Sequence, residues 1–143
     1  MGNAFTFKLP YLRENGPTCQ IVLKPSDPTI TELHLEKQAV PAVTVLALID
    51  TGASTTAISR KVVERLSLVA RGTAKVYTSN RSSEIRNTFD VALEFDTDAY
   101  IPLLRVLDAN LSDHSIDCLI GRDVLQYGVL IYNGREKEIT LSF

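Results

Sequence analysis

One apolar segment constrains the fold of this chain more than any other. Residues Val43–Ile49 are apolar or β-branched throughout. A run of this length is typical of a strand that is buried on both faces. It ends abruptly at Asp50, which is followed by Thr51 and Gly52. Because an isolated buried carboxylate is costly, we expect Asp50 to be hydrogen-bonded or to have a charged partner.

The Asp-Thr-Gly tripeptide has two interpretations. A threonine hydroxyl can donate a local hydrogen bond, and glycine lets backbone N–H groups turn toward the carboxylate, which suits a functional aspartate. The same residues also fit an Asx-turn or a helix-capping aspartate in a tight loop. Three residues alone do not separate the two interpretations.

The remaining periodicity predicts a mainly β chain with two short helices. The helices are expected at 60–68, with Ser59 as the N-cap, and at 123–127 before Gly128. Asn133-Gly134 predicts a terminal hairpin between residues 129–132 and 139–143. Short strands with regular turns favour a closed or barrel-like β fold. The other expected strands are 19–23, 32–36, 73–78, 89–95, 101–107 and 117–121.

Length and composition indicate one globular domain, 1–143, with 45% hydrophobic and 22% charged residues. Prolines and glycines punctuate the first thirty residues, which are expected to be loops around one short strand, and residues 1–40 are expected to be a partly irregular extension. A formal net charge of -2 gives no reason to expect nucleic acid or an anionic membrane as a partner. No apolar run approaches the roughly 18 residues of a membrane helix, and no signal sequence is evident. We therefore expect a soluble, cytoplasmic protein in which Cys19 and Cys118 are buried free thiols rather than a disulfide.

A second motif changes the balance for Asp50. The residues Leu119-Ile120-Gly121-Arg122-Asp123 follow it at a distance, and Ala47-Leu48-Ile49-Asp50-Thr51-Gly52-Ala53 precede them. In this order the two motifs resemble those of the retropepsins, the single-domain aspartic proteases of retroviruses and their cellular relatives. The resemblance covers roughly residues 40–143. It implies the closed, barrel-like retropepsin fold and a homodimeric aspartic endopeptidase that acts on a peptide or protein substrate.

The resemblance also implies roles for individual residues. Asp50 would be the catalytic aspartate, Thr51 would hold the two active-site loops together across a dimer axis, and Gly52 would contact the substrate backbone. Residues 78–84 would form the flap tip that closes on substrate. The implied substrate-binding residues are Ala53, Thr78, Ser79, Asn80, Arg81, Ser82 and Ser83, and those that support the site are Ile120, Gly121 and Arg122.

Two departures from the family pattern stand out. Many retroviral members carry an acidic residue two positions after the tripeptide, and it pairs with the arginine after the later glycine. Here that position is Ser54, so the sequence leaves Arg122 without an identified partner. The usual glycine-rich flap tip is also absent, since residues 78–84 contain no glycine.

The implied mechanism needs no metal and no cofactor. Two aspartates about 3 Å apart cannot both ionise, so they share a proton, and one activates a water while the other protonates the scissile carbonyl. The chain has a single Asp-Thr-Gly, so the second carboxylate must come from a second copy. We expect the active-site loops and part of the terminal hairpin to form the interface. The alternative is a non-catalytic dimerisation or peptide-binding module with the same fold.

The other candidate sites can be explained by ordinary structural roles. Asp96-Thr97-Asp98 lacks the glycine and distal glutamate of a calcium loop, so a solvated turn is expected. Ser54 and His114 have no nucleophile elbow to support a catalytic triad. His34 is read as a solvated strand histidine rather than as a ligand or base. Arg81 and Arg86 leave open a preference for acidic substrates or a merely solvated hairpin.

Overall fold

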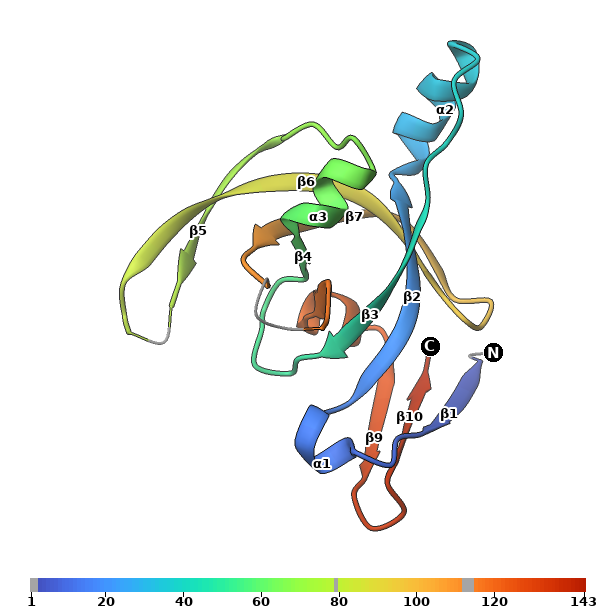
Figure 1. Ribbon diagram of the computed structural model, residues 1–143, viewed down its shortest axis with the longest axis vertical. Helices are drawn as coiled ribbons and strands as arrows, with labels where there is room; N and C mark the ends of the chain where they lie inside the picture. The colour runs from blue at the N-terminus through green and yellow to red at the C-terminus, as the bar shows by residue number, and fades with distance from the viewer. Residues whose placement is uncertain (1–2, 79, 112–114) are drawn as a thin grey trace.

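The computed structural model describes residues 3–78, 80–111 and 115–143, and within them the chain forms two β-sheets (Figure 1). The larger sheet has the strand order β2-β3-β8-β4-β7-β6-β5. An additional pairing of β2 with β6 closes its first six strands into a barrel, which confirms the expected closed β fold. These strands are β2 (Thr18–Pro25), β3 (Val43–Ile49), β4 (Ala57–Ser59), β5 (Gly72–Tyr77), β6 (Ser83–Phe95), β7 (Tyr100–Ala109) and β8 (Cys118–Ile120).

The barrel is filled by side chains that alternate along its strands. On β2, Ile21 and Leu23 are fully buried, and on β3 the inward residues are Val45, Ala47 and Ile49. Burial of such side chains contributes roughly 1.5–3 kcal/mol each. The predicted strand at 43–49 is therefore confirmed. The expected burial on both faces is wrong, because burial alternates along the strand and Thr44 on the other face is exposed. The last residue of the strand places Asp50 at the end of a well-packed barrel strand.

β5 lies outside the closed barrel and pairs only with β6. Figure 1 shows the two strands arching away from the barrel as a ribbon, with their turn at its far end. The register runs from Gly72 opposite Thr88 to Tyr77 opposite Ser83. The turn between them holds the residues predicted to form the flap tip.

The smaller sheet joins the two ends of the chain. Its order is β1 (Ala4–Lys8), β10 (Glu138–Ser142) and β9 (Val129–Asn133), all antiparallel. The termini lie side by side in Figure 1, and Phe143 N donates to Asn3 O at 3.1 Å. The predicted terminal hairpin is confirmed, but β10 is paired on both sides within its own chain. It therefore offers no free edge to a second copy.

Four short helices lie in the described residues: α1 (Leu12–Asn15), α2 (Asp27–Leu35), α3 (Arg60–Arg65) and α4 (Arg122–Leu125). The last two match the two helices that were predicted. Ser59 caps α3 as expected, because its Oγ accepts from Val62 N at 3.3 Å.

The N-terminal region differs from the prediction. The first thirty residues were expected to be loops around one short strand, within a partly irregular extension of residues 1–40, yet the described part of this region contributes β1, α1, β2 and α2. The alternation at 32–36 was interpreted as a strand, and this was wrong because residues 32–35 lie within α2 and Glu36 is its C-cap. Ser26 stands at the N-cap and Pro28 in the first turn, and both residues indicate the start of a helix. This pattern is stronger evidence than an alternation of only five residues. His34 is exposed on this helix, which Figure 1 shows projecting from the barrel.

The two cysteines are buried and free, as predicted. Cys19 on β2 and Cys118 on β8 both pair with Ala47, from opposite sides of β3. One intervening strand puts their backbones about 10 Å apart, which is too far for a disulfide. Burial raises the pKa of the Cys19 thiol to about 12 and also raises the pKa of Cys118, so both stay protonated and unreactive.

None of the helices in the described residues combines the length and the apolar character needed to cross a membrane.

Candidate active site

The carboxylate of Asp50 lies in a loop that its own backbone folds around it. Gly52 N donates to Asp50 Oδ1 at 2.9 Å, and Ala53 N donates to Asp50 O at 3.1 Å. A Cβ on Gly52 would lie 3.1 Å from Asp50 Oδ1, so glycine allows this close approach. Asp50 is half-buried. The local partner that the sequence demanded is the N–H of Gly52.

The second motif lies directly beside this loop. β3 and β8 run parallel with Ile49 opposite Ile120, and Asp50 N donates to Ile120 O at 2.8 Å. A Cβ on Gly121 would lie 2.8 Å from the carbonyl carbon of Thr55 and 3.0 Å from the Ala53 oxygen. Gly121 thus packs against the backbone of the loop, as the sequence motif implied, and larger side chains are excluded there.

Asp123 joins the two motifs, although the sequence analysis gave it no role. Its Oδ2 accepts from Thr56 N at 2.9 Å and its Oδ1 from Thr56 Oγ1 at 2.7 Å. Thr56 Oγ1 in turn accepts from Gly121 N at 3.1 Å. Asp123 belongs to the second motif of the sequence. Its partner could have been inferred from Thr56, a threonine six residues after Asp50. The network fixes the end of the Asp50 loop to the start of α4.

Arg122 has a partner that the sequence did not reveal. Its Nη1 donates to the carbonyl oxygen of Thr51 at 2.6 Å, and its backbone N donates to Ala53 O at 2.8 Å. Ser54, which occupies the acidic position of many retroviral members, is exposed. A main-chain carbonyl therefore replaces the side-chain carboxylate as the group that holds this arginine.

The predicted flap residues do lie at a hairpin tip. Thr78 N donates to Ser82 O at 2.9 Å, and the two hydroxyls are 2.7 Å apart. Arg81 has φ 60, in the left-handed region that glycine adopts without strain. Ser79 lies outside the described residues. The tip is polar and closed by its own hydrogen bonds, although it contains no glycine.

The other candidates from the sequence gain no support. In the turn at 96–98, Thr97 Oγ1 accepts from Ala99 N at 3.4 Å, and the two aspartates are exposed. No cluster of three histidine, cysteine or acidic residues suited to a metal occurs among the described residues. His114 lies outside those residues, so its pairing with Ser54 is not tested.

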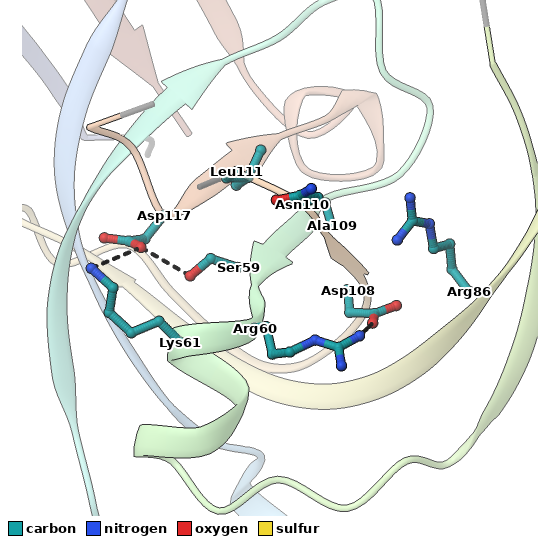
Figure 2. A pocket seen from close by; sticks show the side chains of 9 residues that line it. All are labelled: Ser59, Arg60, Lys61, Arg86, Asp108, Ala109, Asn110, Leu111 and Asp117. Atoms are coloured by element: carbon teal, nitrogen blue, oxygen red, sulfur yellow. Dashed lines mark hydrogen bonds and ion pairs between the residues drawn. The ribbon is translucent and has the colours of Figure 1, made fainter. Parts of the chain in front are cut away.

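A pocket of about 610 Å³ lies apart from the Asp50 loop (Figure 2). It is bounded by the start of α3, the base of the β5–β6 hairpin, the end of β7 and the start of β8. None of residues 50–52 lines it. The lining residues are Ser59, Arg60, Lys61, Arg86, Asp108, Ala109, Asn110, Leu111 and Asp117.

Comparison with known proteins agrees with the two motifs. The aspartyl protease family model matches residues 39–124, which is more than half of the chain, and the chain belongs to this family. The fold is that of the retropepsin-like members. A retropepsin-like aspartic protease from Rickettsia conorii superposes with a TM-score of 0.61 at 12% identity, over 100% of this chain and 93% of the other.

A second structure, the retroviral protease-like domain of Ddi1 from Leishmania major, matches with a TM-score of 0.38 at 17% identity. That match covers 65% of this chain and 74% of the other. No protein of curated function matches the sequence.

Proposed function

We propose that the chain is an aspartic endopeptidase in which Asp50 and the Asp50 of a second copy form the catalytic pair. The observation that carries the proposal is the Asp50 loop itself. Its carboxylate ends a buried strand, accepts a bond from Gly52 N, and lies in a loop that Asp123 and Arg122 hold on two sides. Such rigid support is what acid–base chemistry requires of its reacting groups.

The reaction follows from the chemistry of paired carboxylates. Two carboxyl groups about 3 Å apart share one proton. The ionised member takes a proton from a water, which attacks the peptide carbonyl carbon. The protonated member donates to the carbonyl oxygen, and a proton then passes to the leaving amine. Within the proposal, Thr51 joins the two loops across the axis, and Gly52, Ala53 and the tip residues 78–83 contact the substrate.

The proposal requires a surface for the second copy, and β9 is the best candidate. β9 is an edge strand with β10 on one side only. Val129 and Ile131 share its outer face and are 58% and 55% exposed. An exposed apolar edge strand in a soluble protein invites pairing. β9 also follows α4 directly, so it is continuous with the part of the chain that holds the Asp50 loop.

The second candidate function is a dimerisation or peptide-binding module that cleaves nothing. The hairpin tip favours this alternative, because it is closed by the Thr78–Ser82 bonds and has no glycine to ease its opening. The intact Asp-Thr-Gly loop with its full set of backbone contacts favours the protease.

Incubation with a diverse peptide library decides between the two functions. The protease predicts cleavage by the native chain and a loss on the order of a thousandfold in Asp50→Asn, which keeps the size and polarity of the side chain. Circular dichroism and sedimentation check that the variant keeps its fold and its oligomeric state. Equal cleavage by both proteins, or none by the native chain, would refute the proposed catalytic role.

A further inference from the structure

The pocket in Figure 2 is lined by charged residues that have no role in the proposed reaction. Three cations line it, Arg60, Lys61 and Arg86, together with two acids, Asp108 and Asp117. Its volume of about 610 Å³ falls within the range of ordinary ligand sites. The partners and the exposure of these five charged side chains decide which ligand fits.

The two acids lie in the wall and already have partners. Asp108 has a side-chain exposure of 9% and accepts from Arg60 Nη2 at 3.3 Å and from Asn87 N at 3.1 Å. Asp117 is 22% exposed, and its Oδ1 accepts from Ser59 Oγ at 2.9 Å, with Lys61 Nζ 3.7 Å away. Their negative charge is therefore largely met by groups of this chain.

The cations that line the pocket are more exposed than these two acids. The side chains of Arg60 and Lys61 are 75% and 67% exposed. Arg86 is 32% exposed and binds Glu84 at 2.6 Å through Nη2, which leaves it further N–H groups. A molecule entering the pocket meets guanidinium and ammonium groups. Each of the three has one acidic partner, Asp108 for Arg60, Asp117 for Lys61 and Glu84 for Arg86.

We infer that this pocket binds an acidic peptide segment, whose carboxylates are received by Arg60, Lys61 and Arg86. Charge-assisted bonds from preorganised arginines to carboxylates are among the stronger polar contacts. The inference deepens the proposed function by naming the substrate class. Arg86 lies on β6 opposite Ala74 in the β5–β6 hairpin, Ser59 is the last residue of β4, and Asp117 directly precedes β8.

The test measures binding without cleavage. A labelled, glutamate-rich peptide is titrated against the full-length Asp50→Asn chain by fluorescence anisotropy, beside the same peptide with glutamine at each glutamate. We expect the acidic peptide to bind at least about tenfold more tightly, with an affinity that falls as salt is added. Equal binding of the two peptides would overturn the inference. So would displacement by equimolar inorganic phosphate, which would indicate a site for small anions only.

Variants locate the site. Arg60→Gln with Arg86→Gln should weaken binding of the acidic peptide about tenfold or more. Arg65→Gln with Arg135→Gln removes the same charge from exposed positions outside the pocket and should change little. If loss of Arg60 unfolds the chain by exposing Asp108, Lys61→Gln with Arg86→Gln leaves that pair intact and decides the matter. Native affinity in the pocket variants would refute the inference. It would not bear on the proposed protease activity, which the peptide-library assay tests separately.

Discussion

Arg122 Nη1 donates to the carbonyl oxygen of Thr51, with 2.6 Å between the two atoms. This bond joins the helix that follows the second motif to the middle residue of the Asp-Thr-Gly tripeptide. In this chain the bond stands where the resemblance to many retroviral members implied an arginine–carboxylate pair. Its consequence is that Arg122 controls the position of Thr51, the residue proposed to join the two copies.

Replacing Arg122 should therefore weaken the site more than the fold. A hydrogen bond from a charged group contributes about 1.5–3 kcal/mol, so Arg122→Ala should lower kcat/KM by roughly tenfold to a hundredfold and shift the chain toward monomer. Arg122→Lys, which can still donate, should recover part of the loss. Arg135→Ala, at an exposed turn, is the matched control. Unchanged kinetics and sedimentation in Arg122→Ala would show that Thr51 needs no such support.

Gly121 makes a sharper prediction about stability. In Gly121→Ala the new Cβ would lie 2.8 Å from the backbone of Thr55, so the loop or β8 must shift. We expect a loss of about 1–3 kcal/mol, or a fall in Tm of roughly 3 °C per kcal/mol. Gly72→Ala is the matched control, since its Cβ meets only Thr88 Oγ1 at 3.6 Å. Thermal melts in which both variants equal the native chain would contradict the described packing.

The proposal that β9 forms the dimer interface can be tested with a single charged substitution. Ile131→Lys puts an ammonium in the middle of the proposed strand pairing and should convert dimer to monomer, with loss of peptidase activity at the same dilution. Ala4→Lys makes the same kind of change at the opposite edge of the same sheet and should leave the dimer intact. A dimer that survives Ile131→Lys in analytical ultracentrifugation would place the interface elsewhere.

The anchor of α2 should respond to alkaline pH. The hydroxyl of Tyr100 donates to Asp27 at the start of α2, and this bond, followed by burial and nearby acids, raises its pKa from 10.0 to about 12. A raised pKa in the folded chain means that the contribution to stability is complete below pH 10 and is lost as the pH rises through about 12.

The effect is expected to be small because Tyr100 is 41% exposed. Ultraviolet titration of the phenolates should show one group ionising near pH 12 in the native chain and none there in Tyr100→Phe. Hydrogen exchange in α2 should quicken in the same window. A Tyr100→Phe titration that still contains the late step would assign it to another tyrosine.

The parts that the sequence predicted well depend on local pattern. The run at 43–49, the N-cap at Ser59 and the Asn133-Gly134 hairpin each follow from a few neighbouring residues, and each is present. The two motifs placed Asp50 and Gly121 together because their order matches a known family. In these cases short-range signals and the final fold agree.

What the sequence did not predict depends on contacts between distant residues. β1 is held by pairing with β10 at the far end of the chain, and no local sequence pattern predicts this pairing. The partner of Arg122 is a main-chain carbonyl, and carbonyls carry no sequence signature. The charged residues of the pocket between α3 and the flap hairpin come from four separate segments of the chain, and the sequence analysis had singled out only Arg86 among them. Tertiary structure decides all three features.

The central claim is that one active site needs Asp50 from two chains, and mixed dimers test it most directly. Native and Asp50→Asn chains are combined in equal amounts at constant total concentration, allowed to exchange subunits, and assayed for peptide hydrolysis. If each site needs two native chains, random pairing leaves about a quarter of the native activity. If each chain works alone, about half remains. A quarter is the result that this account predicts, and a simple fall to half would contradict it.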